Sequence, residues 1–109
     1  NRIEVARNFA TQTGTYLILK GAPTVIAEPN GYCYINTTGN SAIATAGSGD
    51  VLTGIVAAML AQGLSPLQAS ITAVWLHGIA GDIASERLTH YSTIASDIIK
   101  FLPEAFKRF

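Results

Sequence analysis

The sequence predicts an α/β fold in which a helix, a strand and a β-hairpin precede three further helices. Three observations support this prediction. Apolar residues recur at helical spacing near the start of the chain and again through most of its second half. Between these regions lie three short runs rich in β-branched and aromatic residues. The pair Asn30-Gly31 separates the last two runs, and such a pair is a strong signal for a hairpin.

The first helix is expected over residues 1–13. Its apolar residues fall on one face at helical spacing, and they include Ile3, Ala6, Phe9 and Ala10. Gly14 follows at the position where a helix often ends in the left-handed conformation. This segment therefore predicts an amphipathic helix.

Three short strands are expected next. Residues 15–20 are apolar without clean alternation, which is typical of a strand that is covered on both faces. Residues 24–28 and 32–36 flank the turn Pro29-Asn30-Gly31 and form the predicted hairpin.

Residues 37–49 are small, polar and rich in glycine, so they predict a loop. A helix is expected over residues 48–62, with Gly63 as its stop. Ser65-Pro66 then places a capping side chain and a proline in the order that begins a helix. That helix should run to Arg87, and because it is apolar almost all round, it should be buried.

The last helix is expected over residues 93–109, interrupted by Pro103. Four helices, two of them apolar on more than one side, are more than three short strands can cover. We therefore expect the chain to pack against further sheet that it does not itself contain.

The composition limits the function classes. The chain has 109 residues, which fits one domain, and 49% are hydrophobic, which excludes a disordered segment. Only 13% are charged, about half of the ~25% usual for a soluble domain, and the net charge is zero. Such a chain lacks the basic surface that nucleic acid requires. From Pro29 to Gly81, Asp50 is the only charged side chain.

A membrane protein is not expected either. The apolar stretch Val51–Ala61 is shorter than the ~20 residues of a spanning helix, and the chain does not open on a signal peptide pattern. The single cysteine, Cys33, fits the reducing cytoplasm. Since the first residue is Asn1 and not Met, we expect the chain to be part of a longer protein.

The segment around Asp50 is the candidate functional site. Gly47, Ser48 and Gly49 open a helix, so several backbone N–H groups and the positive end of the helix dipole meet where an anion can approach closely. An acidic residue in a first turn is often merely favourable to the dipole. Because Asp50 has no charged neighbour in sequence, we interpret it as functional. The segment is neither a Walker A loop nor a dinucleotide fingerprint, since Leu52 stands where a third glycine would be.

Other polar residues favour structural interpretations. His77 is expected to be a hydrogen-bonded core histidine. Asp82, with Glu86 and Arg87, is expected to form a solvated helix end. Cys33 is interpreted as structural.

Three blocks of this sequence resemble one family. The block TGNSAIATAGSGDVLTG at residues 38–54 is the most specific, and KGAPTVI at 20–26 and HGIAGD at 77–82 accompany it in the same order. They are similar to the signatures of the ADP/ATP-dependent NAD(P)H-hydrate dehydratases, the YjeF C-terminal family of the ribokinase-like superfamily. One departure is Ser41-Ala42, where the family often has proline or alanine followed by glycine.

The resemblance implies a ribokinase-like three-layer αβα domain, of which residues 1–109 are the C-terminal part. It also implies a repair reaction, in which ADP or ATP phosphorylates the ring hydroxyl of hydrated NADH or NADPH and loss of phosphate restores the double bond. Asp50 would be the catalytic base and, with Asn40, would contact the substrate. The anion hole would consist of Gly47, Ser48 and Gly49, and the nucleotide contacts would be Lys20, Gly21, Ala22, Pro23, Thr24 and Gly49.

The implied cofactors are ADP or ATP with Mg²⁺, and the residues suggest no metal site made by the protein itself. The implied partners are NAD(P)H hydrate, the N-terminal half of the same domain and further copies of the chain in a homo-oligomer, in the cytoplasm. Two alternatives stay open. One is a ribokinase-like kinase for a small alcohol such as hydroxyethylthiazole, a sugar or a vitamin, although HGIAGD fits the dehydratases better. The other is a non-catalytic, nucleotide-binding piece, and we expect the chain alone to bind nucleotide weakly and to lack turnover.

Overall fold

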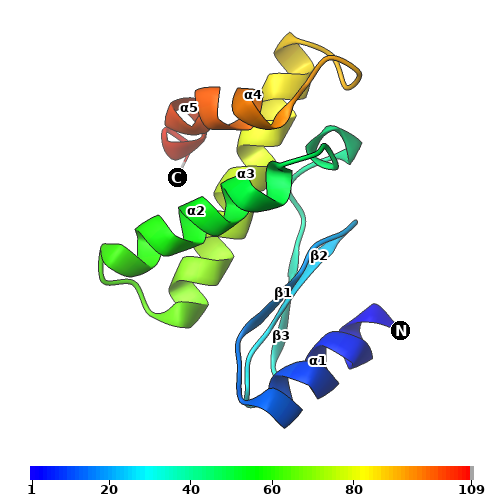
Figure 1. Cartoon of the computed structure of the whole chain (residues 1–109), viewed down its shortest axis with the longest axis vertical. Coiled ribbons are helices and arrows are strands. Elements are labelled where there is room, and N and C mark those ends of the chain that lie inside the picture. The colour runs from blue at the N-terminus through cyan, green and yellow to red at the C-terminus, as the bar shows by residue number, and fades with distance from the viewer. Residues whose placement is uncertain (109) are drawn as a thin grey trace.

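The computed structural model describes residues 1–108, except for the side chain of Ala42. The predicted order of a helix, a strand, a hairpin and then helices is confirmed (Figure 1). The elements are α1 (Arg2–Thr13), β1 (Leu17–Leu19), β2 (Thr24–Ala27), β3 (Cys33–Asn36), a 3₁₀ turn η1 (Ser41–Ile43), α2 (Ser48–Ala61), α3 (Pro66–Arg87), α4 (Ala95–Lys100) and α5 (Leu102–Phe106). Among these residues, no helix is both long and apolar enough to cross a bilayer.

The three strands form one antiparallel sheet in the order β1-β2-β3. The hairpin closes with Ala27 opposite Cys33, and Gly31 in the turn has a φ of 96°, a value that glycine adopts without strain. The predicted hairpin is therefore confirmed.

The sheet lies between two helical layers (Figure 1). Side chains alternate along β2, so that Val25 and Ala27 pack against α1, whereas Ile26 packs into the larger core with α2 and α3. The chain thus builds a helix–sheet–helix sandwich, which is the three-layer αβα arrangement that the family resemblance implies.

Local signals fix the helix ends. The Asn1 side chain accepts a hydrogen bond from the Glu4 backbone N–H at 3.0 Å, and Gly14 ends α1 with a φ of 68°. At the start of α3, Ser65 and Gln68 cap each other's backbone N–H groups. As predicted, α3 ends at Arg87 and is buried along much of its length.

The last helix differs from the prediction. The helix expected over 93–109 is two short helices, α4 and α5, which are separated at Phe101. Pro103 lacks an N–H group and its ring conflicts with the carbonyl four residues earlier, so the break falls just before it. Residue 109, the last in the predicted helix, lies outside the described residues.

The strand β1 forms one edge of the sheet. Within residues 1–108 it pairs only with β2, and each of its three residues is half-buried rather than covered on both faces. The expected cover on both faces is therefore incomplete in this chain.

Candidate active site

A cleft of about 790 Å³ lies between the two glycine-containing loops that the sequence singles out. One wall is the loop after β1, from Lys20 to Thr24, and the other wall includes Thr38, Gly39 and Asn40. The structure therefore brings all five residues predicted to contact nucleotide in the first loop together with Asn40, which is predicted to contact the substrate.

The first loop is held by α1. The guanidinium group of Arg2 donates hydrogen bonds to the carbonyl oxygens of Lys20, at 2.9 Å, and Leu19, at 3.2 Å, and also to that of Pro23. Within the loop, the Thr24 hydroxyl donates to the Gly21 carbonyl at 3.2 Å. Sequence reasoning missed Arg2, since nothing in its local context connects it to a loop that begins eighteen residues later.

Lys20 joins this loop to the glycine-serine turn. Its Nζ donates to the Ser48 hydroxyl at 2.8 Å, and Ser48 is only 1% exposed. A Cβ placed on Gly49 would lie 3.9 Å from the same Nζ. The lysine charge therefore stands directly beside the start of α2.

The turn leaves backbone donors at the start of α2. Gly47 has a φ of 85° and no side chain caps the helix. The Ser48 N–H donates to the Thr45 carbonyl at 3.1 Å, whereas helix geometry offers the N–H groups of Gly49 and Asp50 no acceptor inside the helix. With Lys20 and the helix dipole, this end of α2 attracts an anion such as a phosphate group.

Asp50 lies in the first turn of α2 and is exposed. It does not line the 790 Å³ cleft. The structure thus places Asp50 next to the glycine turn but on a side that stays open in this chain.

His77 lies directly behind the turn. It is 3% exposed, and its Nε2 is 3.0 Å from the Ser48 carbonyl oxygen. Burial first, and the nearby charge of Lys20 second, lower the pKa of His77, while the bond to Ser48 opposes them. A neutral imidazole that donates from Nε2 fits these surroundings. The interpretation of His77 as a buried, hydrogen-bonded histidine is confirmed.

The interpretation of Asp82 as part of a solvated helix end is wrong. Its carboxylate accepts hydrogen bonds from the Gly39 backbone N–H, at 3.0 Å, and from the Asn40 side-chain amide. The same amide donates to the Ser85 hydroxyl at 3.0 Å. Spacing within α3 was misleading because the partners of Asp82 are more than forty residues earlier in the chain. The signal that could have identified it was its place in the HGIAGD block.

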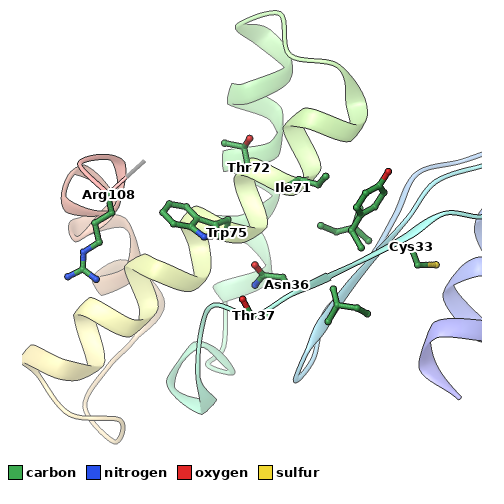
Figure 2. A pocket seen from close by; sticks show the side chains of 10 residues that line it. Cys33, Asn36, Thr37, Ile71, Thr72, Trp75 and Arg108 are labelled. Atoms are coloured by element: carbon green, nitrogen blue, oxygen red, sulfur yellow. The ribbon is translucent and has the colours of Figure 1, made fainter.

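A second hollow, of about 690 Å³, lies between β3 and α3 (Figure 2). Its lining includes Cys33, Trp75 and Arg108, and none of the predicted site residues. The Cys33 thiol is free and partly buried, and it contacts the Gly31 carbonyl at 3.8 Å. Among residues 1–108, no three His, Cys, Asp or Glu side chains are grouped so that they could hold a metal ion.

A sheet between two helical layers, with a glycine turn opening a helix beside a lysine loop, is the arrangement of a ribokinase-like domain. A family model described as NAD(P)H-hydrate dehydratase matches residues 1–104. The chain therefore belongs to the NAD(P)H-hydrate dehydratase family, as the three sequence blocks indicate.

Individual relatives agree with this assignment. The chain is 50% identical over 103 residues to a bifunctional NAD(P)H-hydrate repair enzyme of Moorella thermoacetica, covering 94% of this chain and 19% of that protein. It is 40% identical over 108 residues to the ADP-dependent (S)-NAD(P)H-hydrate dehydratase of Bacillus subtilis, covering 99% of this chain and 39% of that protein. The chain thus spans well under half the length of these curated relatives.

The solved structures agree as well. The crystal structure of the ADP/ATP-dependent NAD(P)H-hydrate dehydratase of Bacillus subtilis, co-crystallised with ATP/Mg²⁺, superimposes with a TM-score of 0.94 at 39% identity. The match covers 99% of this chain and 39% of that one. The fold described above is therefore that of a contiguous part of such an enzyme.

Proposed function

We propose that residues 1–109 are the C-terminal part of a ribokinase-like domain that uses ADP or ATP to restore NADH or NADPH from its hydrate. The observation that carries the proposal is the 2.8 Å contact between Lys20 and Ser48, which brings the lysine loop and the glycine turn together at one helix N-terminus. The proposal also rests on the family match, since the relatives are named for this reaction.

The loop at residues 20–24 and the turn at residues 47–49 would each contact a different part of the nucleotide. Residues 20–24, with Gly49, would contact the ADP or ATP, and the cleft that residues 20–24 line has a volume suited to a ligand of that class. Gly47, Ser48 and Gly49 would form the anion hole for the transferred phosphoryl group. Backbone N–H groups aimed at one point, together with the Lys20 charge, supply the positioning and charge stabilisation that phosphoryl transfer needs.

Asp50 would act as the base, and Asn40 would help to hold the substrate. The ring hydroxyl would give its proton to Asp50 while the hydroxyl oxygen bonds to the terminal phosphorus of the nucleotide. The bond between that phosphorus and the bridging oxygen would break, and the nucleotide would leave with one phosphate fewer. Loss of phosphate from one ring carbon and of a proton from its neighbour would then restore the double bond. The exposed position of Asp50 leaves it accessible to a substrate held by the rest of the domain.

Mg²⁺ would enter with the nucleotide. No group of acidic side chains within residues 1–108 is arranged to hold a metal ion, whereas the phosphates of ADP or ATP are themselves ligands for Mg²⁺. When bound, the ion neutralises phosphate charge.

We further propose that the complete enzyme is cytoplasmic and forms a homo-oligomer. The free Cys33 thiol supports a reducing compartment. The oligomer follows from the family resemblance alone, and the mass of the complete protein in solution tests it.

Substrate choice tests the proposed function against the kinase alternative. The complete polypeptide that contains this chain is incubated with Mg²⁺ and either ADP or ATP, and with NADH hydrate or hydroxyethylthiazole. We expect NADH to be recovered from the hydrate with at least one nucleotide, and no phosphorylated thiazole. Phosphorylation of the thiazole without recovery of NADH would overturn the proposal in favour of a small-alcohol kinase.

A further inference from the structure

One face of α3 lies against two segments of the site, the loop that contains Gly39 and Asn40 and the turn that contains Ser48. Positions 77, 78, 81 and 82 are spaced so that they share a single side of a helix. In this chain they are His77, Gly78, Gly81 and Asp82, the four residues that remain when the apolar positions of HGIAGD are set aside. The function proposed above assigns no role to any of them.

The two polar residues of this face hold different segments. His77 donates from Nε2 to the Ser48 carbonyl, at 3.0 Å, inside the glycine turn. Asp82 accepts from the Gly39 N–H, at 3.0 Å, and from the Asn40 amide, in the loop that lines the cleft. One rigid helix is therefore bonded both to the turn proposed for the phosphoryl group and to the loop proposed for the substrate.

The two glycines let the loop lie directly on the helix. A Cβ on Gly78 would lie 2.8 Å from the backbone carbonyl carbon of Thr38, and one on Gly81 would overlap the Ile43 side chain. The Thr38 hydroxyl also donates to the Trp75 carbonyl of α3 at 3.1 Å. There is no space for a side chain at either glycine, so the backbone of the loop packs directly against α3 and its distance from the helix is fixed by this contact.

We propose that His77 and Asp82 are positioning residues, through which α3 sets the distance between the substrate-facing loop at 38–41 and the phosphoryl-binding turn at 47–49. This inference rests on the proposed function and deepens it. Neither residue lines the cleft of about 790 Å³. They act through Ser48 and Asn40, and a misplacement of about 1 Å between reacting groups can cost on the order of 100-fold in rate.

The Asp82→Asn variant tests the contact with the loop. A carboxylate only accepts hydrogen bonds, whereas the amide that replaces it brings an NH₂ group toward the Gly39 and Asn40 donors. In the complete polypeptide, we expect the KM for NADH hydrate to rise about tenfold, the effect of losing one hydrogen bond to a charged group. The KM for the nucleotide should stay within about twofold.

Glu86→Gln is the matched control, since it removes the same charge one turn later on α3, at an exposed position. It should leave both KM values unchanged. Ser85→Ala removes the second acceptor of the Asn40 amide and also the hydrogen bond from the Ser85 hydroxyl to the Asp82 carbonyl oxygen. It should raise the KM for NADH hydrate about threefold, which keeps the test available if Asp82→Asn does not fold. If neither Asp82→Asn nor Ser85→Ala differs from Glu86→Gln, the positioning role of Asp82 is overturned.

The positioning role of His77 is tested by two substitutions, of which only one keeps a hydrogen-bond donor for the Ser48 carbonyl. The amide of His77→Gln can place an N–H near the position of Nε2, whereas His77→Phe fills the space without a donor. We expect kcat to fall about tenfold or more in His77→Phe and to stay within about threefold of wild type in His77→Gln. Equal losses in the two variants would show that His77 only fills space.

Amide hydrogen exchange separates this inference from the proposed function. We expect faster exchange in residues 37–41 of Asp82→Asn than of Glu86→Gln, and faster exchange in residues 47–50 of His77→Phe than of His77→Gln. These differences do not depend on turnover. If the complete wild-type polypeptide recovers no NADH, the proposed function fails, but the exchange pattern still decides whether α3 holds the two segments. Equal exchange within each pair of variants would overturn the inference.

Discussion

Lys20, Ser48 and His77 form a polar series that crosses the site from an exposed loop to the buried side of α3. The Lys20 ammonium group donates to the Ser48 hydroxyl, and the His77 ring donates to the Ser48 carbonyl. A buried serine is thus bonded to two side chains that come from different layers of the fold. Since Ser48 begins α2, the series fixes the direction in which the free N–H groups of the turn point.

Replacing Asp50 tests the chemistry at this scale. In the complete polypeptide, Asp50→Asn should lower turnover of NADH hydrate by about 100-fold or more, because a general base contributes on the order of 10² to 10⁴ in rate. Nucleotide affinity, measured by calorimetry with ATP and Mg²⁺, should stay within about threefold because the loop at 20–24 is unchanged. Turnover close to that of wild type would remove Asp50 as the base.

Burial of His77 makes stability depend on pH. Because desolvation holds the pKa of His77 below its ordinary value of 6.5 in the folded state, the unfolded chain binds a proton first as the pH falls. The contribution of the neutral ring is thus fully present above pH 6.5 and is lost as the pH falls below that value toward the folded-state pKa.

Denaturant unfolding of the complete polypeptide at pH 7.5 and pH 5.5 measures this dependence. We expect the loss of unfolding free energy between the two conditions to be smaller in His77→Gln, whose side chain does not titrate, than in wild type. An identical loss in both proteins would contradict the assignment of a buried neutral histidine.

Elements whose signals are local were predictable from the sequence, and contacts between distant segments were not. Asn30-Gly31 specified the hairpin because the turn needs a positive φ, and Ser65-Pro66 specified the start of α3. The glycine turn before Asp50 was found in the same way. Arg2 and Asp82 were missed, because their partners are chosen by the packing of α1 and α3 and not by neighbours in sequence.

The capping box of α3 carries a prediction at the scale of the element. Ser65→Ala removes the acceptor of the Gln68 N–H, and it should lower the free energy of unfolding by about 1 kcal/mol. Ser96→Ala, at an exposed position within α4, is the control and should change it by less than about 0.5 kcal/mol. Equal effects in the two variants would show that the cap does not stabilise α3.

At the scale of the whole molecule, the low share of charged residues, 13%, fits a chain whose apolar surface is covered by the rest of a larger domain. A third hollow, of about 570 Å³, lies between β1 and α2 beside the edge of the sheet, and its lining includes Ile18, Val56 and Leu60. We propose that the rest of the domain packs along this edge, because the Bacillus subtilis relative is more than twice as long as the region that it shares with this chain. Apolar residues that are exposed here would then be buried in the complete protein.

Two exposed helix positions test where the rest of the domain packs. Leu60 in α2 is 44% exposed and Val5 in α1 is 61% exposed. In the complete polypeptide, Leu60→Glu should lower the free energy of unfolding by about 2 kcal/mol, since it would bury a charge, whereas Val5→Glu should change it by less than about 0.5 kcal/mol. Comparable losses would place the rest of the domain elsewhere.

Recovery of NADH from NADH hydrate, with Mg²⁺ and ADP or ATP, tests the central claim most directly. It is measured for the 109-residue chain, verified by intact mass and free of any second polypeptide, and for the complete polypeptide. The account predicts turnover by the complete polypeptide and none by the 109-residue chain alone, because that chain would supply the proposed phosphoryl-binding turn and Asp50 without the rest of the domain. Full turnover by the verified 109-residue chain, or none by the complete polypeptide with either nucleotide, would contradict it.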